Sequence, residues 1–186
     1  MAIPQKNEER LMTGEELARR PDLNPCELVN GRVVPMAPAG RIHGEAESRL
    51  DVKLALYAEQ TGSGRVMVGE VGIYTGREPD TVRGADIVFM SHERYARCGP
   101  SAFLDVVPEL VVEILSPEDR PGQVKEKIQE YLSAGVDRVW FVNPRRRSVL
   151  VYRSSGQMET LEVGDTLRDD EILPGFALPL SELFRD

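Results

Sequence analysis

Two acidic residues lie inside segments that otherwise have the composition of buried strands. Asp86 lies within residues 84–90 (GADIVFM), and Glu113 lies within residues 110–115 (LVVEIL). Both segments are short, rich in β-branched and large apolar residues, and bounded by Gly, Pro or Ser, which predicts two core strands. An unpaired carboxylate in such a strand costs several kcal/mol, so each one needs a cation, a metal ion or a catalytic role.

If the two strands are neighbours, the carboxylates can converge on one Mg²⁺ ion whose other ligands are waters and phosphate oxygens. Such an ion lowers the pKa of a bound water and stabilises the charge that develops on a phosphorus. A nearby lysine would orient or deprotonate the water, or neutralise the developing charge. The alternative is that each carboxylate lies at a strand end and pairs with an arginine. The presence of both, followed by a helix that carries lysines, favours the functional interpretation.

The elements that must position these groups follow from the pattern of apolar residues and turns. A capping-box sequence begins a short helix at Thr13, and Asn30-Gly31 is a strong hairpin signal. A strand, a helix and a second strand over residues 110–142 predict a parallel crossover. The fold class is therefore α/β, with a mixed sheet and helices on both faces. The expected elements are a hairpin over 26–34, helices over 43–60, 91–98 and 123–134, strands over 65–74, 84–90, 110–115, 137–143, 148–152 and 157–162, and a tail of loop and helical half-turn over 173–184.

Composition limits the classes of protein to consider. With 186 residues, 41% of them hydrophobic, the chain is expected to form a single domain over residues 1–186, with residues 1–10 flexible. It has no apolar stretch of the roughly 20 residues that span a bilayer, and its N-terminal residues lack a signal-peptide pattern, so we expect no membrane association and a cytoplasmic location. The net charge of −8 argues against a generic nucleic-acid coat protein but is compatible with a nuclease.

The helix over residues 123–134 offers two lysines. Lys125 and Lys127 flank its apolar stripe at similar angles, and Lys127 also lies one turn before Tyr131, which is an accessory candidate. Helix geometry therefore permits Lys127 without selecting it. Either lysine could instead be a solvated flank that extends past core residues.

Two further residues are accessory candidates. His43 shares the inward face at the start of the long helix, where it could hydrogen-bond a phosphate or a carboxylate, or be a satisfied core residue. Arg120 follows the strand that contains Glu113 and could contact a phosphate or pair with a neighbouring carboxylate. Cys26 and Cys98 have no spacing that would suggest a zinc site.

The order of several short motifs resembles that of the Uma-type restriction endonuclease family, which belongs to the PD-(D/E)XK nuclease superfamily. The likeness covers most of the chain. Each motif is weak by itself, whereas their order and spacing are specific. The motifs are ELVNG at 27–31, RGADIVF at 83–89, VVEILSP at 111–117, KIQEY at 127–131, AGVDRVWFVNP at 134–144, LPGF at 173–176 and LF at 183–184.

The resemblance implies a restriction-endonuclease-like fold and assigns roles to individual residues. Asp86 and Glu113 match the two motif acids that bind metal, and Lys127 matches the lysine of the site. In the superfamily pattern that lysine follows the Glu by two residues, a position that is Leu115 here. The resemblance also places Glu27 at the rim of the site as a further acid.

The function that the resemblance implies is metal-dependent hydrolysis of DNA phosphodiester bonds, with Mg²⁺ as cofactor and Mn²⁺ as a substitute. Cutting two strands with two active sites leads us to expect a homodimer. Two alternatives remain. The chain could be a non-catalytic module that keeps the nuclease fold and binds nucleic acid or protein, or it could hydrolyse a smaller phosphoester.

Overall fold

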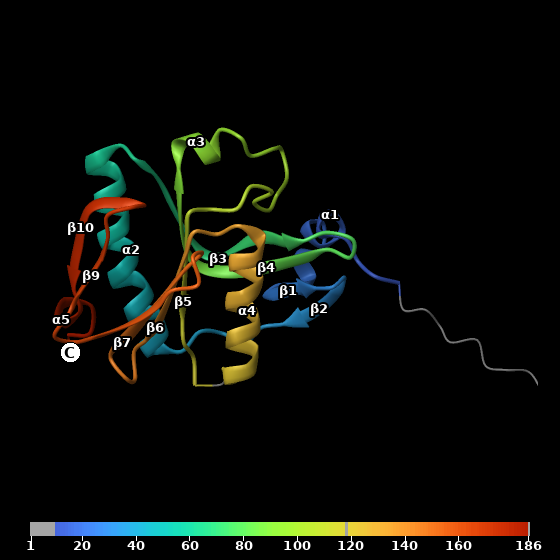
Figure 1. The fold of residues 1–186 in the computed structure, drawn as a ribbon. Coiled ribbons are helices and arrows are strands. Elements are labelled where there is room, and N and C mark those ends of the chain that lie inside the picture. Colours follow the sequence, from blue (N-terminus) through green and yellow to red (C-terminus); the bar gives the residue numbers. More distant parts are fainter. Residues whose placement is uncertain (1–9, 118, 186) are drawn as a thin grey trace, which may run out of the picture.

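A computed structural model describes residues 10–117 and 119–185. The expected flexible segment therefore lies, except for residue 10, outside the described residues. Eight strands form one mixed sheet in the order β2-β1-β4-β5-β6-β7-β8, with β3 paired to β4 as well (Figure 1). The strands are β1 (Cys26–Val29), β2 (Arg32–Pro35), β3 (Gly64–Gly76), β4 (Thr81–Ser91), β5 (Leu110–Ile114), β6 (Arg138–Asn143), β7 (Ser148–Arg153) and β8 (Met158–Glu162).

The helices, apart from η1, lie within a few residues of the expected helical segments. They are α1 (Gly14–Ala18), the short 3-10 helix η1 (Pro21–Leu23), α2 (Arg41–Thr61), α3 (His92–Tyr95), α4 (Pro121–Ala134) and α5 (Leu180–Leu183). β5 and β6 are parallel and connected through α4, which confirms the predicted crossover, and the other named pairs of the sheet are antiparallel. No helix among the described residues is long and apolar enough to cross a membrane.

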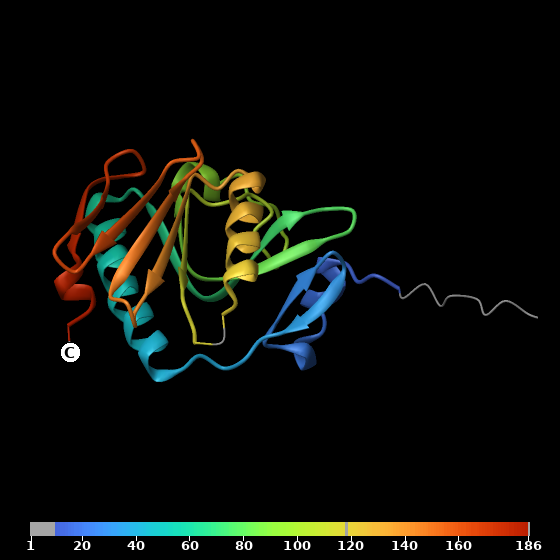
Figure 2. The same cartoon turned by 60° about the horizontal axis from the view of Figure 1, so that its bottom comes forward.

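Helices α2 and α4 cover opposite faces of the sheet (Figures 1 and 2). Alternate residues of each central strand face one helix or the other. Val112 and Leu50 belong to the core on the α2 side, whereas Val111 and Ile128 belong to the core on the α4 side. The expected mixed sheet with helices on both faces is therefore confirmed.

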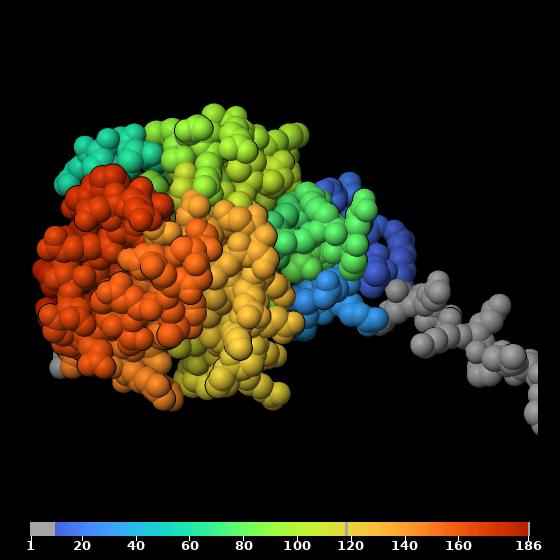
Figure 3. All heavy atoms as spheres, in the orientation of Figure 1, coloured from blue at the N-terminus to red at the C-terminus, as the bar shows by residue number. Residues whose placement is uncertain are grey.

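The N-terminal segment packs against the turn between β3 and β4, beside the main body of the molecule (Figures 2 and 3). The Thr13 capping box is present, because Thr13 Oγ1 accepts from the Glu16 amide at 3.2 Å and Glu16 Oε2 accepts from the Thr13 amide at 3.1 Å. Asn30 and Gly31 both have positive φ, as the predicted tight hairpin requires. The Gly31 amide then donates to the carbonyl of Asp80 at 2.7 Å.

The prediction of a loop over most of the tail is wrong. β9 (Thr166–Asp169) and β10 (Leu173–Pro179) form a separate antiparallel pair that packs beside α2. Apolar side chains at Phe176 and Leu178 are buried there, and the Phe176 ring meets the Tyr57 ring edge-on at 5.6 Å. The Pro and Gly residues favoured a loop, but burial of the alternating apolar residues stabilises a strand.

Candidate active site

Five of the predicted site residues line one pocket of about 420 Å³, namely Glu27, His43, Asp86, Glu113 and Lys127. Its walls come from β1, the loop after β2, the start of α2, β3, β4, β5 and α4. These elements are far apart in sequence and are brought together by the central position of β4, which pairs with β1, β3 and β5. The ionisable side chains that line the pocket and bear on its chemistry are Glu27, His43, Glu70, Arg83, Asp86, Glu113 and Lys127.

Asp86 lies on β4 and is held from two sides. Its Oδ2 atom accepts a 2.6 Å hydrogen bond from the Ile114 amide of the neighbouring strand. Its Oδ1 atom lies 3.3 Å from Nε2 of His43 on α2. The side chain is buried, so a fixed hydrogen bond and an imidazole replace the water that the carboxylate loses.

Glu113 lies on β5 and faces α4. Its Oε2 atom accepts from Lys127 Nζ at 2.9 Å, and its Oε1 atom accepts from the Tyr131 hydroxyl at 2.7 Å. Burial raises the pKa of Glu113, the charge of Lys127 opposes that rise, and the nearby Asp86 adds to it. Each Glu113 oxygen keeps a second lone pair, which leaves the carboxylate able to bind a cation.

Lys127, rather than Lys125, reaches the site. Lys127 Nζ contacts Glu113, lies 3.0 Å from Oε1 of Glu27, and donates to the Gly84 carbonyl at 2.8 Å. Burial lowers the pKa of Lys127, but the two carboxylates raise it by more, so the net pKa is above the ordinary value. Lys125 is exposed and is not among the residues that line the pocket.

Glu27 is part of a buried ion-pair network on the α4 side of the pocket. It accepts from the Gly84 amide at 3.0 Å and from Arg83 at 2.8 Å. Arg83 also forms two hydrogen bonds, at 2.6 and 2.7 Å, with Glu130 of α4. Burial raises the pKa of Glu27, but the charges of Lys127 and Arg83 lower it to below its ordinary value. No local feature of the sequence indicates the Arg83–Glu130 pair, because it joins β4 to α4.

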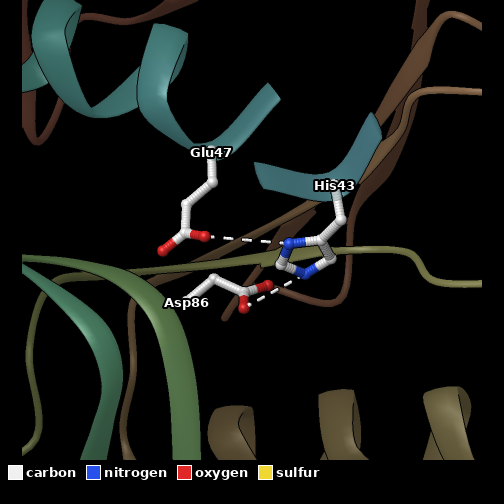
Figure 4. A group of neighbouring side chains, drawn as sticks. All are labelled: His43, Glu47 and Asp86. Carbon is white, nitrogen blue, oxygen red and sulfur yellow. Dashed lines mark ion pairs between the residues drawn. The ribbon is translucent and has the colours of Figure 1, made fainter. Parts of the chain in front are cut away.

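The imidazole of His43 lies between two carboxylates, those of Asp86 and Glu47 (Figure 4). One turn along α2, Oε2 of Glu47 lies 3.7 Å from Nδ1 of His43. This Nδ1 atom is buried and makes no hydrogen bond within the described chain. One ligand atom from each of His43, Glu47 and Asp86 lies within 4.8 Å of the others, which suits a shared cation. The sequence signal for Glu47 was its i, i+4 spacing from the inward-facing His43.

The hydrogen bond with Asp86 raises the pKa of His43, and burial opposes it. Burial raises the pKa of Glu47, and the charge of Asp86 adds to that rise. The three groups are therefore close enough to influence one another electrostatically.

Glu70 was not predicted and is placed by a β-bulge. Val68 of β3 pairs with Ile87 of β4, and Val71 pairs with Ala85. Two residues of β3 therefore lie opposite one residue of β4, Asp86. The two unpaired residues, Gly69 and Glu70, both have positive φ, at 89° and 58°. Bulges of this kind redirect a side chain, and here the bulge lies directly opposite Asp86.

The Glu70 carboxylate occupies space that a side chain at position 84 would fill. A Cβ atom added to Gly84 would lie 2.8 Å from Glu70 Oε2. The pKa of Glu70 is raised to about 7, mainly by partial burial and next by the negative charge of Asp86. The Glu70 side chain forms no hydrogen bond or ion pair with the other residues that the structure describes. It reaches solvent at the mouth of the pocket.

The other accessory candidates differ in their placement. The Tyr131 hydroxyl lies within the site, bound to Glu113 and 3.3 Å from the Gly84 carbonyl. Arg120 occupies the N-cap position of α4 without a side-chain capping hydrogen bond, is exposed, and is not among the residues that line the pocket. A contact between Arg120 and a substrate phosphate therefore stays a prediction.

A mixed sheet flanked by helices, with acidic residues of two adjacent strands and a helix lysine around one pocket, defines the restriction-endonuclease-like class of nuclease folds. The family model Uma2, described as "Putative restriction endonuclease", matches residues 14–181, and the chain belongs to this family.

One solved structure is similar over almost its whole length. It is described as a putative nuclease belonging to DUF820 from Anabaena variabilis ATCC 29413. It superposes with a TM-score of 0.78 at 20% identity, covering 93% of this chain and 97% of that one, which shows the shared fold. A comparison with curated protein sequences gives no match.

Proposed function

We propose that this protein is a Mg²⁺-dependent endonuclease that hydrolyses DNA phosphodiester bonds, with Mn²⁺ as a substitute metal. The observation that carries the proposal is the convergence of Asp86, Glu113 and Lys127 on one pocket, from three separate elements. Membership of a restriction endonuclease family supports the same reaction class.

Asp86 and Glu113 are the proposed ligands of Mg²⁺. When bound, the ion would activate a water and offset the negative charge of the phosphate. Asp86 is oriented by the Ile114 amide, and Glu113 by the Tyr131 hydroxyl. Lys127 holds a positive charge beside Glu113, where it would stabilise the charge that develops on the phosphate.

The charge of the pocket also supports a requirement for cations. Its walls contain six carboxylates but, besides His43, two positively charged side chains, Arg83 and Lys127. A phosphodiester would be repelled from such a pocket unless divalent cations were present. The carboxylates are Glu27, Glu70, Asp86, Glu113, Asp119 and Glu126.

Three further features belong to this proposal. The chain acts as one domain over residues 1–186. It pairs with a second copy, so that two active sites cut the two strands. Its location is the cytoplasm, where it meets DNA without a membrane partner.

A specific observation favours one alternative function, a non-catalytic module that binds nucleic acid or protein. Position 115 holds Leu115 in place of the expected lysine, and both Glu113 oxygens already accept hydrogen bonds. In that case the site would be a structural ion-pair network. DNA affinity that falls steeply with salt, and that is unaffected by metal or by Glu113→Gln, would favour this alternative.

Cleavage assays with Mg²⁺ or Mn²⁺ test the proposal on supercoiled plasmid, short duplexes and nucleotides. We expect the wild-type protein to nick or cut DNA, Glu113→Gln to be inactive, and Glu93→Gln, which changes an exposed acid on α3, to retain activity. Glu113→Gln that cleaves as fast as the wild type would contradict the proposal. Cleavage of nucleotides without cleavage of polymers would point to a smaller phosphoester.

A further inference from the structure

The α4 side and the α2 side of Asp86 differ in how the negative charge of their carboxylates is balanced. On the α4 side, Glu113 and Glu27 share Lys127, and Glu27 and Glu130 share Arg83. Every carboxylate in this network has a cationic partner within 3.0 Å. The α4 side therefore balances its charge with its own residues.

On the α2 side, the carboxylates have no such partner. Glu47 has the His43 imidazole at 3.7 Å as its closest ionic contact within the described chain. The side chain of Glu70, which lies opposite Asp86 at the bulge, has no hydrogen bond or ion pair among the described residues, although the charge of Lys127 lowers its pKa. Two carboxylates, those of Glu47 and Asp86, thus flank one imidazole, and the repulsion between them, to which Glu70 adds, favours the binding of a cation.

An unpartnered buried atom points to the same conclusion. His43 is 8% exposed, and its Nδ1 atom, directed toward Glu47, makes no hydrogen bond within the described residues. Leaving a buried imidazole nitrogen without a partner is costly, and metal coordination is one of the functions that imidazole nitrogens serve. Figure 4 shows the imidazole between the carboxylates of Glu47 and Asp86.

We infer that a second divalent cation binds on the α2 side of Asp86, with His43, Glu47 and Asp86 as ligands. Asp86 would then be shared with the Mg²⁺ ion assigned to Asp86 and Glu113. The inference rests on the proposed nuclease function and extends it to two cations, an arrangement that can stabilise both the attacking and leaving oxygens of a phosphoryl transfer.

The donor set specifies the class of cation. An imidazole with two carboxylates suits Mn²⁺ and other first-row transition metals better than Mg²⁺, which prefers oxygen ligands. The two sites should therefore differ in metal preference. Mg²⁺ can fill the Asp86–Glu113 site, whereas Mn²⁺ can fill both.

Pulsed electron paramagnetic resonance of Mn²⁺ tests this directly, because a coordinated imidazole nitrogen modulates the electron spin echo. Calorimetric titration of Mn²⁺ alone gives the number of ions bound. The variants are His43→Gln, Glu47→Gln and Glu113→Gln. The matched control is Glu45→Gln, an exposed acid on the same helix that pairs with Arg41. Circular dichroism and thermal melting establish that each variant is folded, and Glu47→Gln provides the test if His43→Gln does not fold.

We expect the wild-type protein and the control to bind two Mn²⁺ ions with nitrogen modulation. His43→Gln should bind one ion without modulation, and Glu47→Gln should bind one. Glu113→Gln should retain the nitrogen-coupled ion. Wild-type protein that lacks nitrogen modulation, or His43→Gln that still binds two ions, would overturn the inference.

The same experiment separates this inference from the proposed function. A single ion without nitrogen coupling that is lost in Glu113→Gln would overturn the α2-side site and leave the proposed nuclease site intact. A single nitrogen-coupled ion that persists in Glu113→Gln would support the α2-side site and contradict the Asp86–Glu113 site.

Discussion

The two sides of Asp86 contain similar acids in different electrostatic states. Toward α4, Glu27 and Glu113 are bound by Arg83 and Lys127 at hydrogen-bonding distances. Toward α2, Glu47 has only the His43 imidazole, at 3.7 Å, as an ionic contact among the described residues, and Glu70 makes no ion pair there, although the charges of Lys127 and His43 lower its pKa. The α4 side therefore balances its charges with its own residues, whereas the α2 side leaves negative charge that the proposed second cation would balance.

The largest effect on stability should come from removing Lys127, a cation of the α4-side ion-pair network. Lys127→Ala leaves Glu27 and Glu113 buried without their shared cation, so we expect a loss of about 3 kcal/mol in the free energy of unfolding. That loss corresponds to a melting temperature lower by roughly 10 °C. Cleavage should also disappear, whereas Mn²⁺ binding should persist because the carboxylates remain. Thermal melting, plasmid cleavage and calorimetry measure the three effects.

Lys125→Ala is the matched control, since Lys125 is an exposed lysine on the same helix. Its effect on unfolding should stay within about 0.5 kcal/mol. Equal destabilisation by the two substitutions, or full cleavage by Lys127→Ala, would contradict the assignment of Lys127.

The second largest effect on stability should come from binding Mn²⁺ at the α2-side site. At a free Mn²⁺ concentration 100 times the dissociation constant, binding to the folded state adds about 2.7 kcal/mol. The melting temperature should then rise by roughly 5 to 10 °C and return to its starting value when the metal is removed with a chelator. Calorimetric melting of Glu113→Gln, which lacks the other proposed site, checks this, and an unchanged melting temperature at saturating Mn²⁺ would show that the α2 side binds no ion.

The smallest effect concerns Glu70 and depends on pH. Its folded-state pKa is raised to about 7, first by burial and then by Asp86, so the folded state holds a proton that the unfolded state releases above about pH 4.5. Stability should therefore fall as the pH rises from about 4.5 to 7. The charged groups that face Glu70 are Asp86, Lys127, Glu27 and His43.

Glu70→Gln removes this dependence. Because the side chain is partly open to water, we expect a gain of about 1 kcal/mol at pH 8 in the absence of metal and no gain near pH 4.5. Chemical denaturation at the two pH values measures the difference. A gain that is the same at both pH values would mean that the effect does not come from ionisation of the Glu70 carboxyl group.

The comparison also explains which residues could be found from the sequence. Asp86 and Glu113 stand out because each interrupts an apolar strand, and that signal is local. The choice of Lys127 over Lys125 required the position of α4 against β5. The family resemblance suggested it, and the ion pair with Glu113 shows its geometric basis.

The residues that the sequence did not reveal depend on long-range packing or on an unrecognised irregularity. Glu47 lies one turn after His43, so the helical spacing carried a signal that was not used. Glu70 follows Gly69 in a strand, a pattern that accompanies bulges, but its approach to Asp86 depends on the register of β3 with β4. The Arg83–Glu130 pair joins two elements whose contact is set by the whole sheet.

The most direct test of a cation site centred on Asp86 is calorimetric titration of Mn²⁺ into the wild-type protein and Asp86→Asn, each with and without a short DNA duplex. Asparagine keeps an oxygen that can accept from the Ile114 amide, so the strand contact should remain. We predict clear binding to the wild-type protein and none to the variant. Equal binding to both proteins, or no binding to the wild type even with DNA present, would contradict the account.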